Sequence, residues 1–179
     1  MKSFDDLIKP DKRSKKYPPE WVEKQLTEVP LSTKVPKKIR EMVALAQELV
    51  YYGYFRYEFY NLALFYLCIT FETSLGEKYR QKKKRFKKLI NSAKQDGLFP
   101  KPFQSKLISI RNIRNKNAHP FGMVVMPLAM KGFHLITYLI NCIFDEGARK
   151  ILPPIFAKEI EQSKKIEFYI HRCRDSAKQ

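Results

Sequence analysis

The chain has few of the residues that mark several common kinds of functional site. Its 179 residues include only three cysteines, Cys68, Cys142 and Cys173, which lie far apart and form neither a metal-ligand spacing nor a disulfide framework. Only six glycines are present, and no glycine-rich phosphate loop occurs. The sequence therefore gives no sign of a zinc site, a disulfide-stabilised fold or a P-loop, and we expect no metal and no cofactor.

Carboxylates are missing from the segment between Asp96 and Asp145. Mg²⁺ in nucleases is normally held by clustered Asp and Glu side chains, and this segment offers none, although glutamates from elsewhere could reach it in the folded protein. The whole chain has 35 Lys and Arg against 18 Asp and Glu, a formal charge of +17. This excess favours a polyanionic partner, with nucleic acid first and an anionic membrane surface second.

The sequence also lacks the uninterrupted apolar segments of secreted and membrane-spanning proteins. Its first residues have no apolar stretch of the kind that a signal peptide needs. The segment 123–144 is largely apolar, but Pro127, Lys131, His134 and Asn141 interrupt it and argue against a membrane span. We expect a cytoplasmic protein in which 123–144 is a buried helix or a helix at a dimer interface, with His134 hydrogen-bonded in the core.

Apolar residues recur at helical spacing through most of the chain, which predicts an all-α fold. Residues 1–35, with several prolines, predict a basic, partly extended N-terminal arm with a short helix near Pro19–Gln25, either loose in solvent or partly docked. Residues 36–148 predict an up-and-down bundle of about five to six helices, and 149–179 a C-terminal helix that packs on it or caps it. The expected helices cover about 36–52, 54–81, 81–96, a segment after Pro102 that ends near His119, 123–144 and 155–174.

The stretch Arg111–Pro120 combines two arginines, three asparagines, a lysine and a histidine in ten residues, with no acid. It follows Phe103, Leu107 and Ile110, whose spacing of i, i+4 and i+7 predicts one apolar face of a helix. His119 precedes a proline, which disfavours the α conformation at that position. The helix is therefore expected to end here, with His119 at its C-terminal tip.

Three polar side chains of this stretch are expected on one helix face, because Arg111, Arg114 and Asn115 are spaced i, i+3 and i+4. A guanidinium binds phosphate with a planar fork and does not lose its charge. The imidazole of His119 can move a proton near neutral pH, and an asparagine can orient a hydroxyl or a phosphate oxygen. Together these groups suit metal-free attack on a phosphodiester, with the RNA 2′-OH as the internal nucleophile.

The segment Arg114–His119 reads R-N-x-x-x-H and resembles the R-x(4–6)-H motif of the HEPN superfamily, in the form with a polar residue after the arginine. The helices expected over about 36–148 are similar to the all-α bundle of this family. The resemblance implies a metal-independent endoribonuclease, usually a homodimer with both motifs in one cleft, that acts as a toxin or in antiviral defence. It also implies a regulatory partner, an antitoxin or a sensor subunit. Phe121 replaces the tyrosine of members paired with a nucleotidyltransferase antitoxin, which puts that pairing in doubt.

Carried over to this chain, the motif makes His119 the general acid or base. Arg114 becomes the group that binds the phosphate and the charge of the transition state, and Asn115 the positioning residue. Arg111 and Lys116 would help to bind the RNA backbone.

Glu72 is unusual because it ends the apolar stretch 67–71 of the helix that we expect at the centre of the bundle. One interpretation is an exposed or hydrogen-bonded glutamate at the end of the bundle. The other is a partner that orients Arg114 or His119.

A second basic segment, from Lys78 to Lys88, contains eight bases and no acid. It leads into the helix expected at 81–96. Such a run is either a solvated face or a surface that contacts phosphates without reading sequence. The residues that we assign to RNA contact here are Lys82, Lys83, Lys84, Arg85, Lys87 and Lys88.

Three functions remain open on the sequence. The first is a HEPN-type endoribonuclease that cuts single-stranded or looped RNA, because in-line attack by a 2′-OH needs a flexible backbone. The second is a non-catalytic RNA-binding or assembly module with the same fold. The third is a helical adaptor subunit of a larger complex, with its positive charge directed at an acidic protein or a membrane surface.

Overall fold

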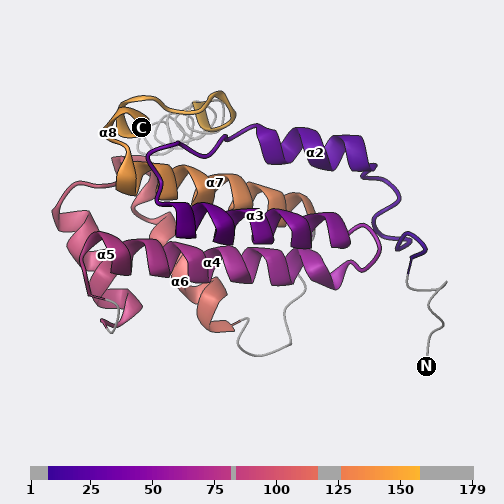
Figure 1. The fold of residues 1–179 in the computed structure, drawn as a ribbon, viewed down its shortest axis with the longest axis horizontal. Coiled ribbons are helices and arrows are strands. Elements are labelled where there is room, and N and C mark those ends of the chain that lie inside the picture. Colours follow the sequence, from indigo (N-terminus) through magenta and orange to yellow (C-terminus); the bar gives the residue numbers. More distant parts are fainter. Residues whose placement is uncertain (1–7, 82–83, 117–125, 158–179) are drawn as a thin grey trace, which may run out of the picture.

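The computed structural model describes residues 8–81, 84–116 and 126–157, and within them the protein is all-α, with seven α-helices and no strand (Figure 1). The helices are α2 (Pro19–Thr27), α3 (Lys37–Tyr52), α4 (Glu58–Lys78), α5 (Phe86–Gln95), α6 (Lys106–Lys116), α7 (Met126–Phe144) and α8 (Glu146–Lys150), with a short 3-10 helix at Lys101–Phe103. The all-α class predicted from the apolar spacing is confirmed.

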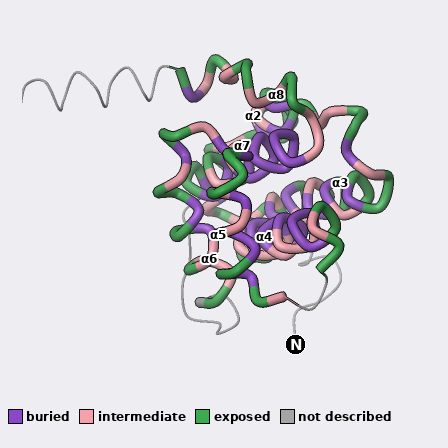
Figure 2. Tube along the Cα trace, turned by 90° about the vertical axis from the view of Figure 1, so that its left-hand side faces the viewer, coloured by how far each residue is buried: buried purple, intermediate pink, exposed green. Residues whose placement is uncertain are grey.

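α4 is the centre of the bundle, as its apolar pattern predicts. It packs against α3, α5, α6 and α7, and Leu67, Phe71 and Leu75 are completely buried along it. Figure 2 shows the buried residues concentrated along α4 and α7. By length and composition α7 could cross a membrane, and 67% of its most apolar window is buried inside the protein. The burial of this apolar layer, at about 25 cal/mol per Å², is the main stabilising contribution to the fold.

Hydrogen bonds at the two ends of the bundle fix the directions of its main helices. The backbone N–H of Met126 donates to the hydroxyl of Tyr57 at 2.7 Å, so α4 and α7 begin at the same end. At the other end Lys34, just before α3, donates to Asp145, just after α7, at 2.8 Å. α3 therefore runs antiparallel to both α4 and α7 (Figure 1).

The N-terminal segment is docked on the bundle from residue 8 onward, which is one of the two alternatives that the sequence leaves open. Ser14 is buried, and its hydroxyl donates to the backbone at the end of α3 at 2.9 Å. Arg13 binds Asp11 at 2.8 Å and Glu58 at 2.7 Å, and its guanidinium lies 4.6 Å from the centre of the Tyr57 ring. This polar cluster fixes the segment against the start of α4.

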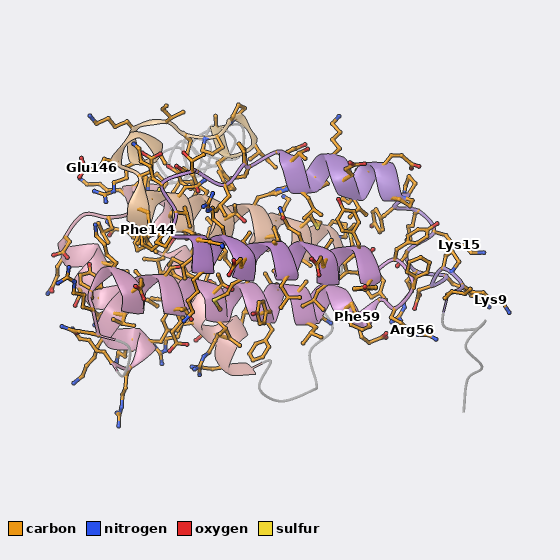
Figure 3. The ribbon with its side chains drawn as sticks, viewed as in Figure 1. Lys9, Lys15, Arg56, Phe59, Phe144 and Glu146 are labelled. Atoms are coloured by element: carbon orange, nitrogen blue, oxygen red, sulfur yellow. The ribbon has the colours of Figure 1, made fainter. Side chains whose placement is uncertain are left out.

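The docked segment places its own cations at one end of the molecule. Figure 3 shows Lys9, Lys15 and Arg56 gathered at this end, away from Phe144 and Glu146 at the other. The N-terminal cations are therefore well separated from α8.

From α2 onward the segment that we separated as an arm is part of the main body. The helix extends two residues beyond the predicted Pro19–Gln25. On α7 the side chain of His134 is only 2% exposed, and its Nε2 lies 2.7 Å from the backbone oxygen of Gln25. His134 is thus a hydrogen-bonded core residue, as expected. The residues of this segment that join the common core are Val22, Leu26, Val29 and Val35.

The two helices predicted to meet at residue 81 do not meet. α4 ends at Lys78 and α5 begins at Phe86. Arg80 has a φ of 52°, a left-handed conformation that interrupts the α-helix. Lys84 and Arg85 therefore precede α5 and do not crowd its first turn, because the helix begins only where its buried stripe begins.

Other boundaries also differ from the prediction. Phe103 belongs to the 3-10 helix and not to α6, and its ring packs 5.3 Å from the rings of both Tyr138 and Phe156. α8 crosses the boundary that we placed at residue 148. Residues 154–157 are helical, as expected near the start of the last helix, whose remainder lies outside the described residues.

Candidate functional site

The R-N-x-x-x-H motif lies at the C-terminal end of α6. Arg114 and Asn115 belong to this helix, whose last residue is Lys116. His119 lies outside the described residues. Also outside the described residues are Lys82, Lys83 and the side chain of Lys116.

Arg114 is held by a glutamate from another helix. α6 packs against α4, which brings Arg114 to Glu72, 42 residues away in the chain. The Nε of Arg114 donates to Oε2 of Glu72 at 2.9 Å, and its Nη1 is 3.3 Å from Oδ1 of Asn115. This bond fits both sequence interpretations of Glu72, as a hydrogen-bonded glutamate and as a partner that orients Arg114.

The bond to Glu72 orients the arginine more than it stabilises the fold. The Arg114 side chain is 40% exposed and that of Glu72 22%, and ion pairs of this exposure contribute only about 0–1 kcal/mol. Within the described part of the chain, Nη2 of Arg114 has no hydrogen-bond acceptor. A guanidinium fixed through Nε keeps N–H groups for a second anion, and parallel N–H groups suit phosphate oxygens.

A hollow of about 310 Å³ lies beside Glu72. Lys84, which the sequence assigns to RNA contact, lines this hollow together with Glu72, Glu77 and Lys38. The Nζ of Lys84 also lies 3.3 Å from the hydroxyl of Ser92. Because both signs of charge line this hollow, it has no clear preference for a polyanion.

A second hollow, of about 130 Å³, lies between α5 and α6. Two predicted RNA-contact residues, Lys87 and Arg111, lie on opposite walls of it. Asn91 and Lys94 line it as well, although the sequence argument did not single them out. Their spacing with Lys87, at i, i+4 and i+7, places all three on one face of α5 and was a signal that could have found them. The remaining lining residues are Ile90 and Ile108.

The structure does not gather all the predicted site residues into one place. Arg111 faces the hollow beside α5, whereas Arg114 binds α4, so the shared face predicted for the two arginines divides between two neighbours. Arg85 and Lys88 are exposed and line neither of these hollows.

The described residues include no candidate metal cluster and no cysteine with a lowered pKa. Among them, no three His, Cys, Asp or Glu side chains lie close enough together to hold a metal ion. Burial raises the pKa of the Cys68 thiol to about 12 and that of the Cys142 thiol to about 11. Both thiols are therefore protonated near neutral pH, when they are poor nucleophiles.

No protein-family model matches the sequence, and comparison with curated proteins and with solved structures gives no significant match. The function is therefore inferred from the chemistry of these residues.

Proposed function

We propose that this protein is a metal-independent endoribonuclease of HEPN type that cuts single-stranded or looped RNA, as a toxin or an antiviral defence effector. The observation that carries the proposal is the bond between Arg114 and Glu72. It orients the motif arginine while the N–H groups of its Nη2 remain available to a phosphate, which is the arrangement that the proposed chemistry needs.

The reaction is an internal transesterification. The 2′-OH of the RNA attacks the adjacent phosphorus, the bond from phosphorus to the 5′ oxygen breaks, and the products carry a 2′,3′-cyclic phosphate and a 5′-OH. His119 would take the proton from the 2′-OH or give one to the leaving oxygen, an effect worth roughly 10²–10⁴ in rate. Arg114 would bind the charge that builds on the phosphorane, and Asn115 would position the attacked group.

The distribution of charge supports a polyanionic substrate. The motif lies within the segment between Asp96 and Asp145, which has no carboxylate. Lys87 and Arg111 stand on facing helices around one hollow, and Arg111 is one helical turn before Arg114. Contacts of this kind bind the backbone of a nucleic acid without selecting its sequence.

We also propose that the enzyme acts as a homodimer and is controlled by a regulatory protein, an antitoxin or a sensor subunit. Both proposals come from the resemblance of Arg114–His119 to the HEPN motif. A nuclease that contacts only the backbone would cut many cellular RNAs, and a regulatory partner would limit this damage.

The direct test is incubation of the purified protein with single-stranded RNA in excess EDTA, followed by analysis of the product ends. We expect cleavage that leaves 2′,3′-cyclic phosphates, and no cleavage of an oligonucleotide whose 2′-OH groups are replaced by hydrogen. Cleavage that requires added Mg²⁺, or that leaves 3′-OH ends, would exclude the proposed mechanism.

A second candidate is a non-catalytic RNA-binding module. It is favoured by the basic hollow between α5 and α6, which does not depend on the motif. Salt-sensitive RNA binding without cleavage by a homogeneous preparation would identify this function.

A further inference from the structure

The hollow between α5 and α6 has three cationic side chains and no acidic one among its six lining residues. Its cations are Lys87 and Lys94 from α5 and Arg111 from α6. In the part of the chain that the structure describes, none of the three has an ion-pair or hydrogen-bond partner for its side chain.

Some cations elsewhere in the described chain do have partners. Arg13 is paired with two carboxylates, and Lys34 is paired with Asp145 at 2.8 Å. Arg149 donates to the backbone oxygen of Cys142 at 2.7 Å. The three cations around the small hollow are thus brought together without internal compensation, which creates a positive local potential that favours an anion.

The spacing of the two lysines suits a strand that runs along α5 better than a compact anion. Lys87 and Lys94 are seven residues apart on α5, about 10 Å along the helix axis. This corresponds to about three nucleotide steps of a stacked strand at 3.4 Å each. Two lysines at this separation can meet different phosphates of one strand, while Arg111 approaches from the facing helix.

The hollow also has an apolar surface between its cations. Ile90 is buried beneath it, and Ile108 is 53% exposed at its edge. An exposed isoleucine between phosphate-binding side chains offers contact to the flat face of a base or to a ribose. The combination of separated cations and apolar surface matches the alternation of phosphate and nucleoside in a single strand.

We propose that this hollow binds the backbone of single-stranded RNA on one side of the phosphate that is cut, with a nucleoside lying against Ile108. The inference rests on the proposed function, because it assigns the path of the same substrate next to Arg114. It adds Asn91, Lys94 and Ile108 to the substrate-binding residues, and Asn91 lies between the two lysines, where its amide can bond to the backbone.

The test measures equilibrium binding of an uncleavable 2′-O-methyl single-stranded oligonucleotide at several salt concentrations. We compare the wild type with the double variant Lys87→Gln/Lys94→Gln. The control is Lys24→Gln/Lys150→Gln, which removes the same charge from exposed positions on α2 and α8. These helices lie on the opposite side of the bundle from α6 (Figures 1 and 2).

We expect the double variant to bind about tenfold or more weakly at low salt. We also expect the slope of log affinity against log salt to become shallower by about 1.4, since each lost phosphate contact to a single strand is worth about 0.7. The control should change the slope by much less. An equal effect of both pairs would mean that binding follows overall charge, and it would overturn the proposed site.

A second variant tests the hollow without removing a cation. Ile108→Glu places an acid at an exposed position, where substitution leaves the core unchanged, and it should weaken binding at least tenfold. With cleavable RNA it should raise KM and leave kcat at saturating RNA near the wild-type value. Unchanged affinity for RNA in Ile108→Glu would refute the proposed contact.

The binding and cleavage results separate the two proposals. Loss of affinity in Lys87→Gln/Lys94→Gln and Ile108→Glu, with no cleavage by the wild type or any variant, would support the RNA site and refute the nuclease. Cleavage with an unaltered KM in the same two variants would support the nuclease and refute this site. Equal loss of binding to polyglutamate and to the oligonucleotide would overturn RNA as the ligand in favour of an acidic protein.

Discussion

The guanidinium of Arg114 makes two kinds of contact that must coexist for the proposed chemistry. Its Nε donates to Glu72, 2.9 Å away, and its Nη1 to Asn115, while its Nη2 would bind the phosphate. Because the pair is partly exposed, we assign Glu72 a positioning role with little effect on stability. Glu72 itself would not touch the RNA.

Replacement of Glu72 tests this positioning role. We expect Glu72→Ala to lower kcat for RNA cleavage about tenfold, equivalent to about 1.4 kcal/mol of transition-state stabilisation. The kcat of Glu72→Gln should lie between those of the wild type and Glu72→Ala, because an amide oxygen still accepts the Nε–H. The matched control is Glu77→Gln, on the same helix and beside the same hollow but without a bond to Arg114. If Glu72→Ala cuts RNA as fast as the wild type, the positioning role is excluded.

The buried thiols predict a specific dependence of stability on pH. Burial raises the pKa of Cys68 from 9.0 to about 12. Between these values the unfolded thiol ionises while the folded one stays protonated, so the unfolded state binds fewer protons and stability falls as pH rises. We expect this fall in urea unfolding between pH 8 and pH 10, in a Cys173→Ser background.

The variant Cys68→Ala in that background isolates this contribution. Its stability should decline less between the two pH values, and in the parent no thiol should react with a labelling reagent at pH 8 before unfolding. Rapid labelling of the native parent at Cys68 would contradict the burial on which the prediction depends.

At the scale of the elements, the contact between the start of α3 and the end of α7 depends on two polar residues. Asn141, 6% exposed, accepts from the N–H of Ser32 at 2.8 Å and donates to the carbonyl of Pro30 at 2.9 Å. The bonds to Lys34 and Ser32 hold the pKa of Asp145 at about 2. The stabilisation that the ionised Asp145 provides through these bonds is therefore present at neutral pH and is lost as pH falls from about 4 to about 2.

We expect Asn141→Leu to lower the free energy of unfolding by about 1–3 kcal/mol, because it leaves two backbone groups unpaired in a nearly buried site. Urea denaturation measures the change. Ser32→Ala, which removes the bond to Asp145 and the one that the exposed N–H of Lys34 donates to the same hydroxyl, should cost less and is the control. An equal loss in the two variants would show that the backbone bonds to Asn141 contribute little.

The helices that the sequence predicted well are those with a continuous apolar pattern. α3 and α7 begin and end within about three residues of the expected positions because each has a face or a surface that must be buried. The segment between α4 and α5 was predicted wrongly. Its lysines and arginines carry no apolar periodicity, and the left-handed Arg80 has no signature in the sequence.

The candidate site was predictable only in part. The motif itself, and the hypothesis that Glu72 orients Arg114 or His119, came from residue types and their place in an apolar helix. The division of Arg111 and Arg114 between two neighbouring helices could not be predicted from the sequence, because it depends on how α6 packs between α4 and α5. The docking of residues 8–18 likewise depends on tertiary contacts, such as Arg13 with Glu58, that no local pattern encodes.

At the scale of the whole molecule, the charge of +17 is the property most directly tied to the proposed function. Surface charge of this size promotes fast, salt-dependent association with polyanions but does not by itself produce cleavage. The central claim is therefore that a few residues of the motif turn an RNA-binding surface into an enzyme.

The measurement that tests this claim most directly compares RNA cleavage in EDTA by the wild type, Arg114→Ala and His119→Ala. Asn112→Ala, an exposed neighbour in α6, is the matched control. The account predicts that the wild type and Asn112→Ala leave 2′,3′-cyclic phosphate ends at similar rates. Both motif variants should bind the uncleavable oligonucleotide but cut RNA at least about 10² times more slowly. Cleavage by His119→Ala at the wild-type rate would contradict the account.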